Sequence, residues 1–137
     1  MILGVDPGER RIGIAVGDES TGVAVPVEVI DARTIDPVDR VAEIVAERGV
    51  KLVVVGLPVG LSGGEGPAVS AQQGFLESLT EKLDVPVTAY DERLTTVVAE
   101  RAMRAAGGSA ARRKQIRDAV AAQVMLQGYL DAHGGSR

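Results

Sequence analysis

The chain has 137 residues, a formal net charge of −4, no cysteine, and only one phenylalanine, two tyrosines and no tryptophan. A chain of this length is expected to form one domain, and the lack of cysteine excludes disulfides and thiolate metal sites. So few aromatic rings argue against a stacking platform for single-stranded bases. No apolar run approaches the roughly 18 residues that a membrane span needs, and the start of the chain lacks a signal-peptide pattern. The composition therefore predicts a soluble, cytoplasmic protein without a membrane partner.

The start of the chain carries the pattern of a β-hairpin. An apolar run over 2–5 ends in Asp6, and a second apolar run over 11–16 follows a Pro7-Gly8 turn. Two such runs around a short turn predict an antiparallel pair of strands. Asp6 is therefore expected where the first strand ends, with its carboxylate at the edge of a sheet.

Strands and helices alternate in the rest of the chain. Residues 23–30 predict a third strand, and Pro26 favours an edge position because proline cannot donate a ladder hydrogen bond. A helix is predicted over 37–48, with Asp36 as its N-cap and Gly49 as its end. The later elements are a strand, a helix, a strand and two helices, over 51–56, 67–83, 84–90, 95–106 and 111–132.

This order predicts an α/β fold. Three antiparallel strands followed by strand–helix alternation imply a mixed five-stranded sheet, antiparallel over its first three strands and parallel afterwards, with helices on both faces. Residues 1–133 are expected to form a single domain, and 134–137 a flexible tail. His133, the only histidine, is expected to be solvent-exposed in that frayed end.

Acidic residues follow two of the predicted strands. The first strand ends in Asp6 and the fifth in Asp91-Glu92, and parallel strands bring such ends to one edge of the sheet, where α/β folds place their sites. Either acid alone is better explained as a residue that solvates a turn. The pair together makes a shared site more plausible.

Asp118 is the third candidate, and it lies on the last predicted helix. At helical spacing its neighbours are small or apolar, namely Ala121, Ala122 and Met125. A carboxylate on such a surface is costly to bury unless it is paired or bound to metal. An Asp near a helix start that is turned to solvent and stabilised by the helix dipole explains the same spacing equally well.

The type of these side chains indicates the metal. Three carboxylates without cysteine favour Mg²⁺ or Mn²⁺ over zinc. Two such ions can activate water and stabilise the leaving oxygen in phosphodiester cleavage. The sequence thus predicts a two-metal site for cutting a nucleic-acid backbone.

A basic stretch indicates the substrate class. Residues 93–117 hold seven basic residues and only one acid, Glu100, although the whole chain is acidic. The seven are Arg93, Arg101, Arg104, Arg112, Arg113, Lys114 and Arg117. A segregated positive stretch is the expected footprint of a phosphate-backbone partner, although a solvated helix face explains it equally well.

Four motifs in order resemble the YqgF/RuvX family, whose members are Holliday-junction-resolvase-like nucleases with an RNase H-like fold. The motifs cover nearly the whole chain: GVDPGERRIGIAV over 4–16, VVGLP over 54–58 with the glycine-rich stretch after it, DERLTT over 91–96, and DAVAA over 118–122. Arg117 departs from the apolar residue usual before the last Asp of this family, and adds a further positive charge.

The resemblance implies three catalytic, metal-binding carboxylates, Asp6, Glu92 and Asp118, with Asp91 a less favoured alternative to Glu92. It also implies maturation of the 5′ end of pre-16S ribosomal RNA as the function, by a monomer or homodimer. Arg10 and Arg11 follow the first motif's Asp, and Arg93 follows Glu92, so each is expected to hold a phosphate near the cut or to solvate a turn. The alternatives are cleavage of four-way DNA junctions and a non-catalytic nucleic-acid-binding module of the same fold. An actin-like ATPase fragment is disfavoured because the chain is long enough for only one lobe.

Overall fold

The computed structural model describes residues 1–8, 10–57, 67–91 and 110–133. The observed elements, in chain order, are β1 (Ile2–Pro7), β2 (Arg11–Asp18), β3 (Val23–Asp31), α1 (Pro37–Arg48), β4 (Leu52–Leu57), α2 (Pro67–Lys82), β5 (Val87–Asp91) and α4 (Ala110–His133). Each matches an element predicted from the sequence to within a few residues. The helix predicted over 95–106 and the tail over 134–137 lie outside the described residues.

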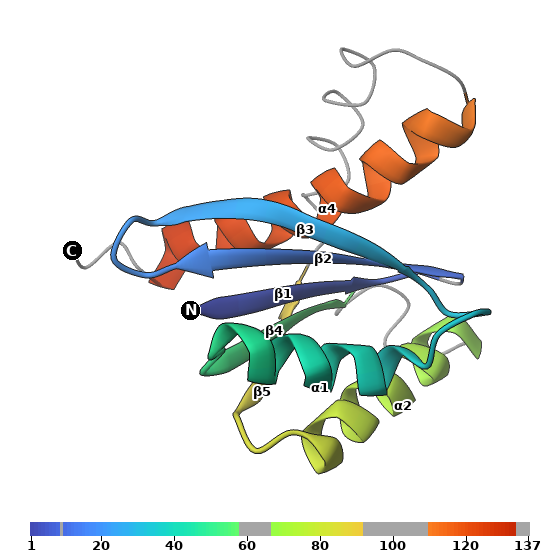
Figure 1. The fold of residues 1–137 in the computed structure, drawn as a ribbon, viewed down its shortest axis with the longest axis horizontal. Helices are drawn as coiled ribbons and strands as arrows, with labels where there is room; N and C mark the ends of the chain where they lie inside the picture. The colour runs from blue at the N-terminus through green and yellow to red at the C-terminus, as the bar shows by residue number, and fades with distance from the viewer. Residues whose placement is uncertain (9, 58–66, 92–109, 134–137) are drawn as a thin grey trace.

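The five strands form one mixed sheet in the order β3-β2-β1-β4-β5 (Figure 1). β1 pairs with β2 and β2 with β3 in antiparallel fashion, whereas β1–β4 and β4–β5 are parallel. The predicted α/β fold is therefore confirmed. Pro26 lies on the edge strand β3, as its missing N–H requires.

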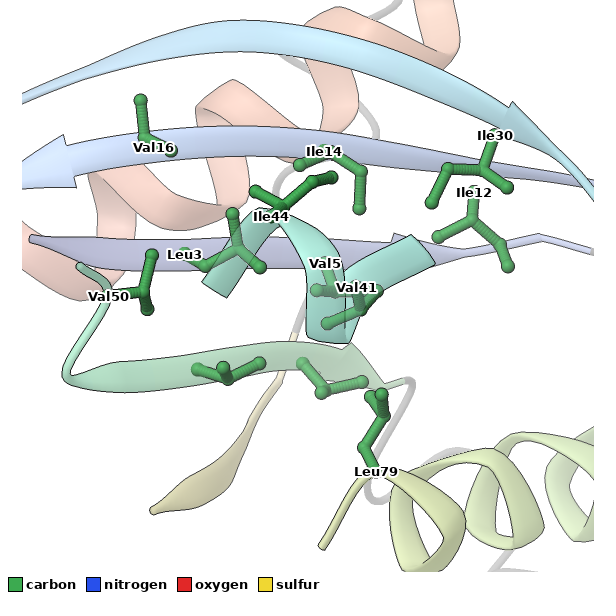
Figure 2. Close-up of a cluster of buried hydrophobic side chains, with 12 residues drawn as sticks. Leu3, Val5, Ile12, Ile14, Val16, Ile30, Val41, Ile44, Val50 and Leu79 are labelled. Carbon is green, nitrogen blue, oxygen red and sulfur yellow. The ribbon is translucent and has the colours of Figure 1, made fainter. Parts of the chain in front are cut away.

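Helices cover both faces of this sheet. α1 and α2 lie against one face and α4 against the other (Figure 1). The larger core cluster fills the α1/α2 face and is made of branched aliphatic side chains, mostly from β1, β2, β4 and α1, with Ile30 of β3 and Leu79 of α2 (Figure 2). On β1, Leu3 and Val5 belong to this cluster, whereas Ile2 belongs to the cluster under α4. Alternation along β1 therefore places Asp6 on the face that α4 covers.

The first hairpin turns later than expected. β1 continues through Pro7, which pairs with Ile12, and the backbone N–H of Gly8 donates to the carbonyl of Arg11 at 2.9 Å. The reversal therefore lies between Gly8 and Arg11 and not at Pro7-Gly8. Proline is compatible with this last position of β1 because the parallel pairing with β4 ends at Val5.

Two other boundaries differ slightly from the expectation. β5 begins at Val87 rather than at residue 84, because Pro86 supplies only its carbonyl to the ladder, accepting from Val53 N at 3.0 Å. His133 is the last residue of α4 and not part of the tail. The glycines that follow it, Gly134 and Gly135, are the stop signal that the sequence carries.

α1 follows its local signals. The Asp36 side chain accepts from the backbone N–H groups of Val38 and Asp39, and Pro37 occupies the first turn. Gly49 ends the helix at φ 64°, a left-handed conformation that glycine adopts without strain. The predicted N-cap and C-terminal stop are both confirmed.

A two-point ion pair joins α1 to the edge strand. Arg40 donates from Nε to Glu28 Oε2 at 3.0 Å and from Nη2 to Oε1 at 2.7 Å, and both side chains are about one quarter exposed. These hydrogen bonds hold the pKa of Glu28 below its usual range, and desolvation opposes them only in part. A depressed carboxyl pKa stabilises the fold above the unfolded pKa, and this stabilisation is lost as the pH falls through the folded value.

We therefore expect Glu28→Gln to lower the free energy of unfolding by about 1 kcal/mol at pH 7, with the deficit shrinking as the pH falls below about 4.5. Urea titrations of both proteins between pH 3 and pH 7 measure this difference. Glu81→Gln, at an exposed position of α2, is the control and should show no such trend. A deficit that stays constant over this pH range would contradict the assigned role of the pair.

Candidate nuclease site at the carboxyl edge of the sheet

Asp6 lies at the edge of the sheet where the parallel strands end. It is half-buried on the α4 face and pairs in register with Gly13 of β2. On the other side, the last β1–β4 pair is Val5–Val55, and Gly56 is the next residue of β4. Side chains at directly opposite positions lie about 4.5–5.5 Å apart, and the position on β2 opposite Asp6 is a glycine. Gly13 therefore contributes no side chain beside this carboxylate.

Asp91 shares this edge but not this face. β5 pairs with β4 through Gly56–Tyr90 and Leu57–Asp91, so Asp91 lies about 10 Å from Asp6, two strands away. Tyr90 packs against the cluster under α4, whereas Val87 packs against the α1/α2 core. Alternation along β5 assigns position 91 to the face of Val87, opposite to Asp6. Glu92, the preferred candidate, lies outside the described residues.

α4 crosses the sheet in close contact because glycines on the strands leave room for it. A Cβ on Gly4 would lie 2.9 Å from Leu126 Cβ, and a Cβ on Gly17 would lie 2.7 Å from Leu130 Cδ1. Because Gly17 pairs with Ile2, α4 runs from the middle of β1 towards the start of β1 as the residue numbers of the helix increase. Residues earlier in α4 therefore lie towards the end of β1 that carries Asp6 (Figure 1).

Two glutamines set the position of α4 along the edge strand. Ala24 N donates to Gln127 Oε1 at 3.0 Å, and Gln127 Nε2 donates to Gly22 O at 2.7 Å. Gln123 Nε2 donates to Ala24 O at 3.2 Å. These contacts satisfy backbone groups that an edge strand otherwise leaves unpaired, and they fix the register of the helix against the sheet. The sequence carries no signal for this contact, because a glutamine one turn from another has no distinctive local pattern.

Asp118 lies on the first half of α4. It precedes Ala122 by one turn and Leu126 by two, and both of these are fully buried against the sheet. Leu126 is the residue that lies above Gly4. Residue 118 precedes it by eight positions, which correspond to about 12 Å along the helix axis in the direction of Asp6. The structure describes only the backbone of α4 at residue 118. Its position is compatible with the expected approach to Asp6.

Two tyrosines not predicted to belong to the site connect β5 with α4, and Tyr90 of this pair lies near the carboxyl edge. The rings of Tyr90 and Tyr129 meet edge to face, with centroids 5.9 Å apart and an interplanar angle of 85°. A Cβ at Gly128 would lie 3.1 Å from the Tyr90 hydroxyl, so the helix packs against the end of the Tyr90 side chain here. This pair holds α4 against the β4–β5 side of the sheet. The strand alternation that gives Tyr90 the face of Asp6 was the signal that could have found it.

The basic candidates are described only in part. Arg10 is exposed and Arg11 is half-buried at the start of β2. Arg93, Arg101 and Arg104 lie outside the described residues, and Arg112, Arg113, Lys114 and Arg117 lie in the part of α4 for which only the backbone is described. The expected positive stretch therefore begins beyond β5 and ends on the first half of α4.

A metal site is compatible with this donor set but is not complete within the described residues. No group of three potential ligands comes together among residues 1–8, 10–57, 67–91 and 110–133. The described donor, Asp6, offers a carboxylate with Gly13 opposite to it, and hard oxygen ligands of this kind suit Mg²⁺ or Mn²⁺. In the part of the chain that the structure describes, no helix is long and apolar enough to cross a membrane.

The fold is shared with Holliday junction resolvases of known structure. Thermus thermophilus RuvC in complex with Holliday junction substrate matches with a TM-score of 0.57 and 19% identity, over 98% of this chain and 96% of that chain. The fowlpox virus resolvase matches with a TM-score of 0.56 and 11% identity, over 96% and 97%. At such identities the likeness establishes the fold, and the predicted RNase H-like sheet is confirmed.

The sequence comparisons establish the family. A family model described as "RuvX: Holliday junction resolvase" matches residues 1–132, so the chain belongs to the RuvX family. A Chloroflexus aggregans protein named "Putative pre-16S rRNA nuclease" is 46% identical over 96% of this chain and 93% of its own length. A Bacillus cytotoxicus protein of the same name is 44% identical over 96% and 98%. The resemblance inferred from the four motifs is thereby confirmed.

Proposed function

We propose that this protein is a divalent-metal-dependent nuclease that acts in the cytoplasm on the 5′ end of pre-16S ribosomal RNA. The observation that carries the proposal is Asp6, half-buried at the carboxyl edge of the sheet and directly opposite Gly13 of β2. Membership of the RuvX family and the names of its close relatives support the reaction class and the RNA substrate.

In this proposal Asp6, Glu92 and Asp118 hold two Mg²⁺ or Mn²⁺ ions. Bound there, the metal would supply an activated water and stabilise the leaving oxygen of a phosphodiester. Glu92 is preferred over Asp91 because alternation along β5 assigns position 91 to the face opposite to Asp6. Gly13, directly opposite Asp6 on β2, adds no side chain beside this carboxylate.

The rest of the chain positions these groups. The glutamine contacts to β3 and the Tyr90–Tyr129 pair fix α4, and α4 carries Asp118. The basic residues Arg10, Arg11 and Arg93 would contact phosphates near the cut, and Arg101, Arg104, Arg112, Arg113, Lys114 and Arg117 would hold the backbone further away. Contacts of this type imply affinity that falls steeply as salt rises.

A second candidate is the cleavage of four-way DNA junctions. The family description and the resolvase fold favour it. A symmetric junction is cut by two paired sites, so this activity would require a homodimer, whereas cleavage of a single RNA strand would need only a monomer.

The decisive experiment offers both substrates to the purified protein. A pre-16S RNA fragment with its unprocessed 5′ end and a four-way DNA junction are incubated with Mg²⁺, with Mn²⁺ and with EDTA. The proposal predicts metal-dependent cleavage at the 5′ side of the RNA and none with EDTA. Cleavage of the junction alone would establish the second candidate, and binding without cleavage of either substrate would identify a non-catalytic module.

A further inference from the structure

Arg11 carries an unsatisfied donor at the start of β2. Among the described residues, its Nη1 is the only buried side-chain nitrogen or oxygen without a hydrogen-bond partner. The guanidinium is charged at any physiological pH, and a buried charged donor without a partner is costly. None of the ion pairs within the described ranges includes Arg11. The free protein therefore leaves part of this guanidinium without compensation.

The fold places Arg11 beside Asp6. On β2, Ile12 and Ile14 belong to the α1/α2 core, so alternation gives Arg11 and Gly13 the α4 face. Gly13 is directly opposite Asp6, and Arg11 is therefore its diagonal neighbour on the same face, at a separation of about 7–8 Å that a long side chain can span.

Arg10 does not share this environment, although it is adjacent in sequence. Its side chain is exposed, and its backbone carbonyl accepts from Ala32 N at 2.9 Å. The backbone of Arg11 is held by the Gly8 N–H, which donates to its carbonyl. The two arginines are thus unequal, and only the second presents a buried donor next to Asp6.

We infer that Arg11 forms an anion subsite that binds one backbone phosphate beside Asp6 and does so without a metal ion. The inference rests on the proposed nuclease function and names one of its substrate contacts. Guanidinium–phosphate hydrogen bonds are charge-assisted and often bidentate, so a phosphate supplies the partner that Nη1 lacks. The subsite would hold the nucleic-acid strand next to the proposed metal-binding carboxylate, Asp6, before any metal is bound.

The test is a binding titration in EDTA, with a single-stranded RNA oligonucleotide and a four-way DNA junction as probes. Arg11→Gln is expected to raise Kd about 10–100-fold at low salt and to reduce the slope of log Kd against log salt by about 0.7–0.9. Arg11→Lys should restore the slope but not the full affinity, because it keeps the charge and loses the bidentate geometry. Arg33→Gln is the matched control, since Arg33 is exposed and paired with Asp31 at 3.3 Å, and it should leave the slope unchanged.

Thermal unfolding separates this subsite from a structural ion pair. Because Nη1 is unsatisfied in the free protein, Arg11→Gln is expected to have a Tm equal to or above that of the wild type without nucleic acid. A Tm several degrees lower, or an unchanged salt slope, would overturn the inference. If the wild-type protein binds the probes but cuts neither of them with Mg²⁺ or Mn²⁺, the proposed nuclease function is wrong. The binding titration in EDTA still tests the Arg11 subsite in that case.

Discussion

Replacing Asp6 by asparagine is expected to lower the rate of metal-dependent cleavage by about 10²–10³-fold. Metal ions stabilise the charge of the transition state by several kcal/mol, and each 1.36 kcal/mol corresponds to a tenfold change in rate. Asparagine keeps the size of Asp6 but removes its negative charge, so the fold at the β1 edge should be retained. Single-turnover cleavage of the pre-16S RNA fragment at saturating protein measures the effect, together with the metal concentration that gives half the maximal rate.

The matched control is Asp84→Asn. Asp84 is exposed and precedes β5, at the edge of the sheet opposite to Asp6. It should change neither the cleavage rate nor the metal dependence. Binding of RNA in EDTA should be unchanged or slightly stronger for Asp6→Asn, because a negative charge has been removed near the phosphates. An Asp6→Asn variant that cuts at the wild-type rate would remove Asp6 from the proposed metal site.

Local signals made the elements predictable. Asp36, Pro37 and Gly49 each act within one helical turn, and the structure shows each in its expected role. Pro26 likewise indicated an edge strand through its own chemistry, the absence of an N–H. The turn at Pro7-Gly8 was wrong because β1 has no parallel partner beyond Val5, a tertiary fact that makes proline acceptable within the strand.

For the candidate site, the sequence was enough to predict which acidic residues lie at one edge of the sheet. It was not enough to predict which faces of the sheet they occupy or which side chains surround them. Strand order and acid positions were enough to put Asp6 and Asp91 at the same edge. Whether they share a face depends on the exact position of β5, which the sequence did not specify, because the predicted strand began three residues too early. The buried donor of Arg11 could not be predicted at all, since it depends on which side chains surround it after folding.

The contact between the sheet and α4 joins residues more than a hundred positions apart, and it leads to the second large effect. Gly4→Ala is expected to lower the free energy of unfolding by about 1–3 kcal/mol, because the new methyl group would lie 2.9 Å from Leu126 Cβ. No rotation of the Leu126 side chain relieves a contact between two Cβ atoms, so α4 itself must move. Urea unfolding measures the loss, and cleavage at a temperature where the variant is folded measures the displacement of α4.

Alanine substitutions at two other glycines are expected to change the stability differently from Gly4→Ala. At Gly17 the nearest atom is Leu130 Cδ1, the far end of a flexible side chain, so Gly17→Ala should cost less than Gly4→Ala. At Gly74, on the exposed side of α2, nothing lies within 4 Å, and Gly74→Ala should stabilise the protein by about 0.5–1 kcal/mol. Because α4 carries Asp118, Gly4→Ala should reduce cleavage by more than its fraction unfolded explains, whereas the other two variants should not. Full activity of folded Gly4→Ala would mean that the position of α4 is not critical for the site, and would weigh against Asp118 as a metal ligand.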